Sequence, residues 1–150
     1  MDNITIRDAS DNDIPLILGL LYDLGRPKPQ KDSEVDTFRK LVKKYTADSD
    51  KTILVAELDD MKIVGMVSIV FLSRLNRNTL EIYIPELVVL GKYQNQGIGK
   101  KLINSCITLA KKKKCHRIRL ESGNQRKDSH QFYAQLGFEQ SALSFTKNLD

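Results

Sequence analysis

Two stretches near the start of the chain repeat their apolar residues with the period of an α-helix. The first predicts a helix that Asn12 or Asp13 caps and that Gly25 ends. The second predicts a helix that follows Ser33, because Ser33 and Asp36 lie at the spacing of a capping box. Both helices would present one apolar face to a core.

Runs rich in apolar and β-branched residues dominate the middle of the chain. Residues 52–58 and 62–72 predict an antiparallel hairpin joined by the polar turn at Asp59 and Asp60. Residues 79–90 predict a third strand that contains Pro85. Because proline has no N–H to give to a neighbouring strand, we expect the pairing to be interrupted near Pro85.

A glycine-bearing turn follows this strand and opens a helix whose apolar stripe includes Leu102 and Cys106. A short strand over residues 116–121, a helix over 129–136 and a last strand over 138–146 complete the pattern. The predicted order is β-α-α-β-β-β-α-β-α-β. It indicates an α/β (α+β) fold with a mixed, mostly antiparallel sheet of about six to seven strands and about four flanking helices.

Composition narrows the class of protein. The chain has 150 residues, of which 41% are hydrophobic and 29% charged, and this predicts a single domain over residues 1–150. No apolar run approaches the ~20 residues of a membrane span, and the N-terminus lacks a secretion signal, so we expect a cytoplasmic protein with no membrane partner. The net charge of +5 attracts anions in general, whether nucleic acid, anionic lipid or a phosphorylated cofactor.

The cysteines and histidines do not suggest a metal centre. Cys106 and Cys115 stand at no metal-ligand spacing with His116 and His130, and two cysteines make no disulfide framework. Cys106 lies on an apolar helical stripe and is interpreted as a core residue. The lysine run at 111–114 is interpreted as a solvated helix end, and without a stacking platform or recognition helix we expect no nucleic-acid partner.

The segment from Gln94 to Lys100 carries the most chemical information, because it ends a strand and opens a helix. Its amides have no helical partner and the helix dipole adds about +0.5 charge, so the turn suits a phosphate. A P-loop is excluded, because Gln94 and Lys101 stand where that motif needs a glycine and a Ser or Thr. A dinucleotide fingerprint is excluded, because Leu102 stands where its third glycine belongs.

Three ordered motifs resemble the GNAT N-acetyltransferase superfamily. Gln94, Gly97 and Gly99 match its cofactor loop of Gln or Arg, two residues, Gly, one residue, then Gly or Ala. Residues 86–89 resemble its fourth strand, and residues 129–138 resemble its helix that ends in an aromatic pair followed by Gly-Phe. The resemblance covers the whole chain in length and element order. It implies a GNAT-like sheet with a splayed central strand pair and the use of acetyl-CoA as the acetyl donor.

The resemblance also implies which residues contact the cofactor. The backbone of residues 87–89 would hold the pantetheine arm and the acetyl carbonyl, with a backbone N–H at Val89 polarising that carbonyl. The loop over residues 94–100 would hold the pyrophosphate. The complete set of implied cofactor-binding positions is Leu87, Val88, Val89, Gln94, Asn95, Gln96, Gly97, Ile98, Gly99, Lys100, Ser129 and Phe132.

Amide formation also needs groups that move protons. An alkylamine is almost wholly protonated at pH 7, and Glu86, beside the expected acetyl position, is the candidate base that accepts its proton. The sequence departs from a common family form with two adjacent acids, because Pro85 precedes Glu86. Glu81, Tyr83 and a chain of waters therefore stay open as alternatives. The resemblance gives Tyr133 the role of protonating the leaving thiolate.

These observations predict an enzyme that transfers an acetyl group from acetyl-CoA to a primary amine by direct attack in a ternary complex. A non-catalytic acyl-CoA-sensing regulatory module is the alternative. The acceptor, a small molecule or a peptide, stays open, and its specificity is expected to come from the first two helices and from residues 73–78 and 142–145. A homodimer stays open as the assembly.

Overall fold

The computed structural model describes residues 3–59, 62–122 and 127–149. The chain forms two compact units, residues 1–119 and residues 120–150. The first unit contains the sheet and three helices, and the second contains one helix and the C-terminal segment. Of the predicted turn at Asp59 and Asp60, Asp60 lies outside the described residues.

Six strands lie among the described residues, and the pairings β1–β2, β2–β3, β3–β4 and β3–β5 are antiparallel, which confirms the predicted, mostly antiparallel sheet. Their order in the sheet is β1-β2-β3-β4-β6, and β5 pairs with β3 off this path. The strands are β1 (Ile4–Asp8), β2 (Lys51–Leu58), β3 (Lys62–Leu72), β4 (Glu81–Ile84), β5 (Leu87–Val89) and β6 (Ile118–Leu120).

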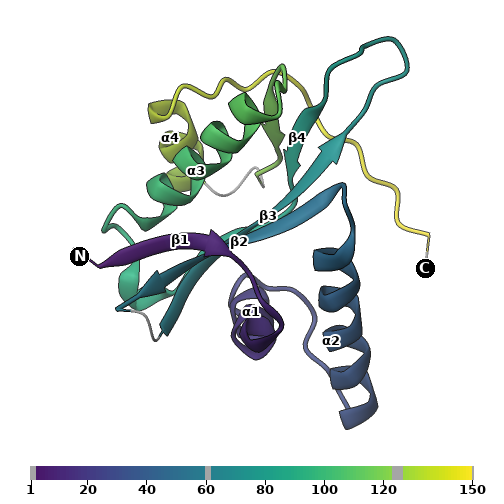
Figure 1. Ribbon diagram of the computed structural model, residues 1–150, viewed down its shortest axis with the longest axis vertical. Helices are drawn as coiled ribbons and strands as arrows, with labels where there is room; N and C mark the ends of the chain where they lie inside the picture. The colour runs from purple at the N-terminus through teal and green to yellow at the C-terminus, as the bar shows by residue number, and fades with distance from the viewer. Residues whose placement is uncertain (1–2, 60–61, 123–126, 150) are drawn as a thin grey trace. The chain divides into compact units, whose positions relative to one another are not determined.

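Two layers of helix cover the sheet of the first unit. Figure 1 shows α1 and α2 on one face of the sheet and α3 on the other. The four α-helices of the described residues are α1 (Ile14–Asp23), α2 (Asp32–Ala47), α3 (Ile98–Lys112) and α4 (Lys127–Gln135), and short 3-10 turns are η1 (Asp11–Asp13) and η2 (Gly91–Tyr93). No described helix has both the length and the apolar character needed to cross a membrane.

The core follows the predicted periodicity. On the α1–α2 face, Ile17 of α1 and Val42 of α2 are buried against Val55 of β2 and Met66 of β3. On the other face, the buried stripe of α3 consists of Ile98, Leu102, Ile103, Cys106 and Ala110. Each large apolar side chain that is fully buried contributes about 1.5–3 kcal/mol, so both helical layers are held mainly by this burial.

Gly65 of β3 lets the α3 layer approach the sheet closely. A Cβ built at Gly65 would lie 3.1 Å from the Val88 carbonyl oxygen and 3.4 Å from a methyl carbon of Leu102. A side chain here would therefore push β5 and α3 away from β3. Glycine at this position keeps β5 and the start of α3 in their places.

Pro85 interrupts the third predicted strand, as expected. β4 ends at Ile84 and β5 begins at Leu87. The pairing of β3 with β5 is shifted by one residue relative to its pairing with β4, so one extra residue bulges between them. The bulge turns one long strand into two short ones that share β3 as a neighbour.

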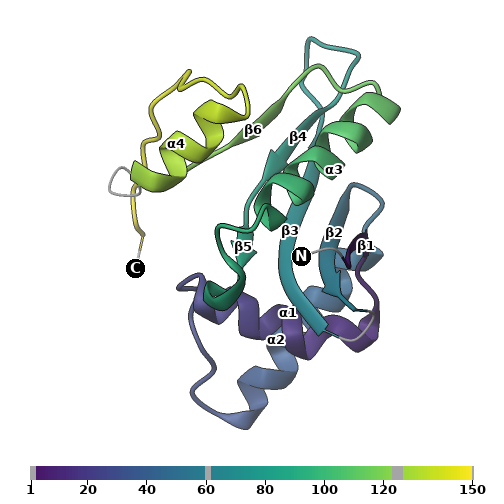
Figure 2. The ribbon, with the colours of Figure 1, turned by 90° about the vertical axis from the view of Figure 1, so that its left-hand side faces the viewer.

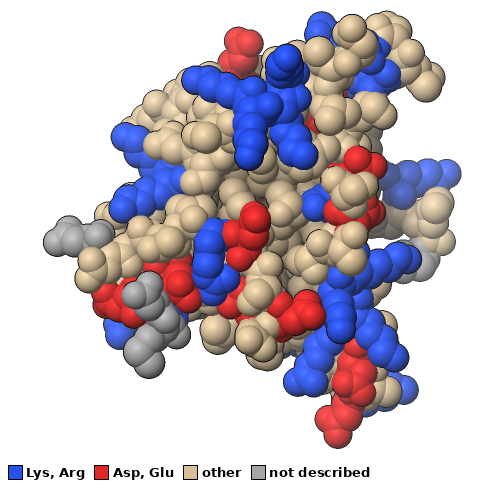
Figure 3. Space-filling view, viewed as in Figure 1, with Lys and Arg blue, Asp and Glu red and all other residues tan. Residues whose placement is uncertain are grey.

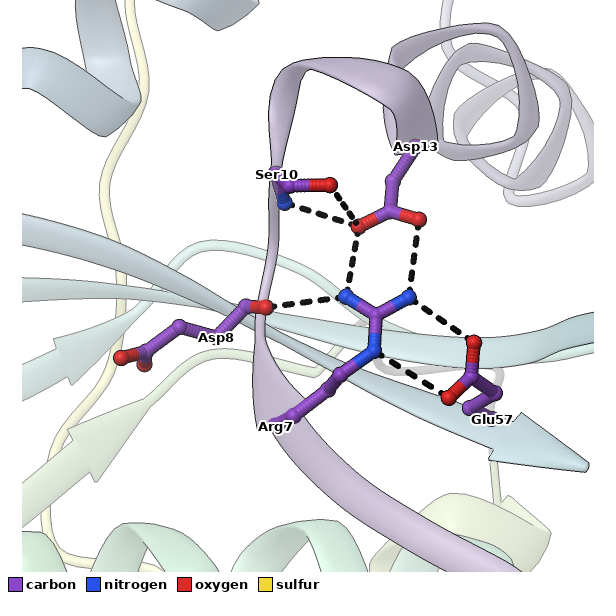
Figure 4. A network of polar contacts seen from close by, with 5 residues as sticks. All are labelled: Arg7, Asp8, Ser10, Asp13 and Glu57. Atoms are coloured by element: carbon purple, nitrogen blue, oxygen red, sulfur yellow. Dashed lines mark hydrogen bonds and ion pairs between the residues drawn. The ribbon is translucent and has the colours of Figure 1, made fainter. Parts of the chain in front are cut away.

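An arginine on β1 ties α1 to the sheet (Figure 4). Arg7 donates five hydrogen bonds: two to Asp13, two to Glu57 and one to the Asp8 carbonyl, at 2.8–3.3 Å. Asp13 is the N-cap residue of α1, as predicted, but its buried carboxylate accepts from Arg7 and Ser10 and makes no cap bond to α1. The hydrogen bonds from Arg7 keep the pKa of Asp13 below its usual range.

Two predictions about secondary structure are wrong. α2 begins at Asp32 with Lys31 as its N-cap, so Ser33 is not the cap. The carboxylate of Glu34 accepts the Gln30 N–H at 3.2 Å, and this acid, rather than the one three residues after Ser33, stabilises the helix start.

The predicted strand over residues 138–146 does not form, and the described part of this segment has no regular structure. Beyond Phe138, its large apolar side chains are not buried, since Leu143 is 75% and Phe145 91% exposed. A high strand propensity does not create a strand when no partner strand covers one of its faces. One side-chain bond in the segment runs from Ser144 Oγ to Glu121 at 2.8 Å.

Candidate active site

The main chain of β5 presents hydrogen-bonding groups on an edge that no described strand occupies. The Glu86 carbonyl accepts from a β3 amide, and the Leu90 N–H donates to a β3 carbonyl, both at 2.9 Å. Backbone groups alternate between the two edges of an antiparallel strand. The N–H groups of Leu87 and Val89 therefore point to the opposite edge, where β5 has no strand partner among the described residues.

A glycine-bearing turn links β5 to α3 (Figure 2). Gly97 is the N-cap of α3 and has a φ of 84°, a left-handed conformation that favours glycine. Asn95 also has a positive φ, of 62°. In this part of the structure, Lys101 is the first residue whose N–H donates to a carbonyl four residues back, that of Gly97, at 3.1 Å. The amides of the first helical turn before it have no helical partner.

The turn is fixed to β5 and carries positive charge. Gln94 Nε2 donates to the Val89 carbonyl at 3.0 Å, which places the first residue of the motif against the open edge of β5. No Asp or Glu occurs between Leu87 and Lys101, whereas Lys92, Lys100 and Lys101 do, and all three are exposed. This combination of free amides, a helix N-terminus and lysines suits an anion such as a diphosphate.

Glu86 is held at the bulge by Ser68 of β3. The Glu86 N–H donates to Ser68 Oγ at 2.9 Å, and Ser68 Oγ donates to the Glu86 carboxylate. Arg26, in the loop between α1 and α2, lies with Nε 3.4 Å from the same carboxylate and donates to the Pro85 carbonyl at 3.2 Å. Because the carboxylate is only partly exposed, these contacts fix its orientation toward the α1–α2 side of the sheet.

A tyrosine from α2 completes this cluster. Tyr45 donates its hydroxyl to the Ile69 carbonyl at 2.9 Å. Burial, and then the negative charge of Glu86, raise the pKa of Tyr45 to about 12, against a weaker opposing effect of Ser68. Tyr45 is therefore a hydrogen-bond donor at every physiological pH, and it cannot act as a base there.

Tyr133 and the other predicted residues of α4 belong to the second unit. Tyr133 is half-buried and makes edge-to-face contacts with Phe132 at 5.1 Å and Phe138 at 5.7 Å between ring centroids. Ser129 is also half-buried. Gly137, with a φ of 89°, ends the helix where the sequence predicts.

Within the first unit, the structure brings together the predicted residues of β5, the turn and Glu86. Glu81 lies apart from them, because it pairs with Leu72, four residues along β3 from Ser68. Three arginines surround the Glu81 carboxylate and keep its pKa at about 2. A carboxylate held ionised in this way is a poor proton acceptor near neutral pH. Tyr83, the other alternative, lies against the guanidinium of Arg119 at 4.9 Å.

The sequence reasoning missed Ser68, Arg26 and Tyr45. Ser68 carried a usable signal, because it is the one polar residue in the apolar run from Ile63 to Val70, and a buried hydroxyl needs a partner. Arg26 and Tyr45 carried none, since both lie in amphipathic or loop segments far from Glu86 in sequence.

Within the first unit, the two thiols and His116 lie outside this cluster. Cys106 is fully buried, which confirms its core role, and burial raises its pKa to about 12. Both cysteines are free thiols. His116 pairs with the Thr79 hydroxyl at 3.0 Å. In the described ranges, no group of three or more His, Cys, Asp or Glu is placed to hold a metal ion.

Comparisons with known proteins agree with this geometry. The sequence profile of the acetyltransferase (GNAT) family matches residues 18–138. Aminoalkylphosphonate N-acetyltransferase of Salmonella typhimurium is 33% identical over 88 residues, a match that covers 59% of this chain and 57% of that protein.

Solved structures resemble the whole chain. A transcriptional regulator from Bacillus halodurans has a TM-score of 0.88 at 28% identity, over 98% of this chain and 100% of that one. Glucosamine-6-phosphate N-acetyltransferase from Arabidopsis thaliana has a TM-score of 0.82 at 22% identity, over 99% and 100% of the two chains. The second likeness shows the fold alone, and together they confirm the predicted architecture.

Proposed function

Since the chain belongs to the acetyltransferase (GNAT) family, we propose that it transfers an acetyl group from acetyl-CoA to a primary amine, by direct attack in a ternary complex. The observation that carries the proposal is the open edge of β5 beside the N-terminus of α3. Acetyl-CoA supplies the activated acetyl thioester when bound. The remaining chemistry belongs to residues of this chain.

The residues of the β5–α3 segment fit the cofactor. A diphosphate would accept hydrogen bonds from the amides around Gly97 that have no helical partner, next to Lys100 and Lys101. The N–H and carbonyl groups on the open edge of β5 can bind an extended pantetheine arm as a neighbouring strand would bind them. Ser129 and Phe132 of α4 stay proposed cofactor contacts on the resemblance alone.

Glu86 is proposed to take the proton from the acceptor. Only about 4 × 10⁻⁴ of an ordinary alkylamine is unprotonated at pH 7, so a proton acceptor beside the amine has a large effect. Ser68 orients the Glu86 carboxylate, and Arg26 occupies its outer side. An incoming ammonium group would take the place of Arg26 on that carboxylate, and the proton then passes to Glu86 directly or through water.

Charge that develops on the acetyl oxygen needs a fixed donor. The N–H of Val89 points to the open edge of β5 and is proposed to donate to that oxygen. Tyr133 is proposed to protonate the thiolate that leaves when the tetrahedral intermediate collapses, which opposes the reverse reaction. No covalent intermediate on the enzyme is needed, in keeping with the buried, unreactive Cys106.

Binding of the cofactor is tested by calorimetry with acetyl-CoA. Gly97→Glu places a negative charge and a strained residue at the helix start and is expected to abolish binding. Gln96→Glu adds the same charge without backbone strain and is expected to weaken binding about tenfold, whereas Asn3→Asp at the start of β1 should leave it unchanged. Equal affinity in all four proteins would refute the assignment of the turn.

A non-catalytic acyl-CoA-binding regulatory module is the second candidate. The likeness to a Bacillus halodurans protein described as a transcriptional regulator favours it. Thiol release from acetyl-CoA over a panel of amines separates the two. Turnover that Glu86→Gln and Tyr133→Phe lower at least tenfold in kcat, with little change in KM for acetyl-CoA, supports the enzyme. Tight acetyl-CoA binding without release above background supports the regulator.

A further inference from the structure

Three arginines converge on the buried carboxylate of Glu81, the first residue of β4. The Glu81 side chain is completely buried. Arg117 Nε lies 3.0 Å and Arg119 Nε 3.3 Å from one of its oxygens, and Arg74 Nε binds the other oxygen. We call Arg74, Arg117 and Arg119 the arginine cluster. It lies entirely within the first unit.

The arginine cluster has more charge and more donors than Glu81 can use. Three guanidinium groups face one carboxylate, so the group as a whole carries two surplus positive charges. Among the described residues, the cluster makes four side-chain hydrogen bonds, all to Glu81, although a single guanidinium has five N–H donors. The side chains of Arg74, Arg117 and Arg119 are 42%, 51% and 34% exposed, so each of them is partly open to solvent.

The pairing of the strands places the cluster on the same face of the sheet as Glu86. Glu81 is paired with Leu72 and Tyr83 with Val70. Side chains of paired residues share a face, and so do residues two apart on one strand, which adds Ser68 to that face. Ser68 in turn holds the Glu86 carboxylate.

The spacing along β3 gives the separation of the two groups. Val70 and Leu72 lie two and four residues beyond Ser68, or roughly 7 and 13 Å at the rise of a strand. Arg119 stacks on Tyr83, which is paired with Val70. The distance from Arg119 to Glu86 is therefore at the short end of this range. An extended small molecule or a short peptide is long enough to span this distance.

A second group of positive charges lies on the α3 face of the sheet, opposite the face that carries Glu81. Lys111, Lys112 and Lys114 are exposed at the end of α3, and Lys113 lies over the Phe71 ring at 5.2 Å. Figure 3 shows Lys and Arg side chains gathered in the upper part of the view, over the C-terminal end of α3. These lysines add to the positive charge at this end of the sheet, but they lie across it from the arginine cluster.

We propose that the arginine cluster binds an oxyanion group of the acceptor, whose amine lies at Glu86 about 7–13 Å away. The inference rests on the proposed acetyl transfer and names its substrate class: amines that also carry a phosphate, phosphonate or carboxylate group. Guanidinium groups bind such oxyanions through paired N–H donors, and Glu81 keeps the three side chains oriented toward them. Arg74 comes from residues 73–78, a segment from which acceptor specificity is expected.

The test compares amines of matched length with and without the anion. The kcat/KM for each ω-aminoalkylphosphonate is divided by that for the plain alkylamine of the same length. This ratio should rise with chain length and exceed tenfold at about six to eight carbons. Aminoalkyl carboxylates of the same lengths distinguish a phosphonate site from a general oxyanion site. Arg119→Gln and Arg117→Gln should each lower the ratio at least fivefold, whereas Arg77→Gln, in the same loop as Arg74, should leave it unchanged.

A binding measurement tests the arginine cluster independently of the proposed acetyl transfer. Calorimetry with methylphosphonate should show binding to the wild type that Arg119→Gln weakens at least fivefold, even if no amine is acetylated. A flat ratio across chain lengths, or no methylphosphonate binding, would overturn the inference while leaving acetyl transfer intact. Variants that raise KM for acetyl-CoA instead of KM for the acceptor would assign the arginine cluster to a cofactor phosphate and overturn it too.

Discussion

Two clusters of arginine and carboxylate in this protein have opposite stoichiometry. At Arg7, one guanidinium serves two carboxylates, those of Asp13 and Glu57, and its five donors are all used. At Glu81, one carboxylate serves three guanidinium groups, whose four hydrogen bonds leave most of their N–H donors unused among the described residues. The first cluster joins β1, β2 and α1, and the second lies at the end of β4.

The difference separates a structural cluster from a recognition site. Saturated donors have nothing left for a ligand, so the Arg7 cluster can only hold the fold together. Unused donors with surplus positive charge lower the stability of the fold, because like charges repel. They form favourable hydrogen bonds and ion pairs when an anion binds. Variants that remove one member of each cluster should therefore affect stability very differently.

Arg7→Leu is expected to have the largest effect, a fall of about 3 kcal/mol in the free energy of unfolding. It leaves the buried Asp13 carboxylate without its cation and disconnects α1 from β2. Urea denaturation followed by circular dichroism measures the change. Arg39→Leu on the exposed side of α2 is the control, expected to cost under about 0.5 kcal/mol. Equal effects of the two would contradict a structural role for Arg7.

Glu81→Gln is expected to cost less, about 2 kcal/mol at pH 7, because the arginines it releases can turn to water. The pKa of Glu81 is lowered from 4.5 to about 2, with the hydrogen bond from Arg74 as the main cause. Below about pH 4.5 the unfolded chain binds the proton first, so this contribution is complete above that pH and is lost as the pH falls toward 2. Denaturation curves between pH 7 and 3 should therefore show the gap between wild type and variant shrinking. A gap that stays constant or widens on acidification would refute the assignment.

The backbone part of the candidate site was predictable because it follows from local rules. Pro85 cannot donate to a strand ladder, and it marks the break between β4 and β5. Gly97 takes the left-handed conformation at the start of α3. Each of these features depends on a few neighbouring residues, so the sequence pattern carries it.

The side-chain part depends on residues that are distant in sequence, and a single sequence does not record which of them meet. Arg26 lies 60 residues from Glu86, and Ser68 lies 18 residues from it. Glu81 was interpreted as an alternative base, because nothing local marks Arg117 and Arg119 as its partners. The absent strand over residues 138–146 has the same origin, since strand formation depends on a partner and not on propensity alone.

Arg117→Gln is expected to have the smallest effect on stability, under about 1 kcal/mol. Its side chain is half-exposed, and Arg74 and Arg119 still neutralise the buried Glu81 carboxylate. Removing Arg119 in the same protein should then cost more than removing it from the wild type, because only one cation remains. Urea denaturation of the single and double variants measures both steps. If Arg117→Gln alone cost as much as Arg7→Leu, all three guanidinium groups would be needed to hold Glu81, and the cluster would have no surplus charge with which to bind an acceptor.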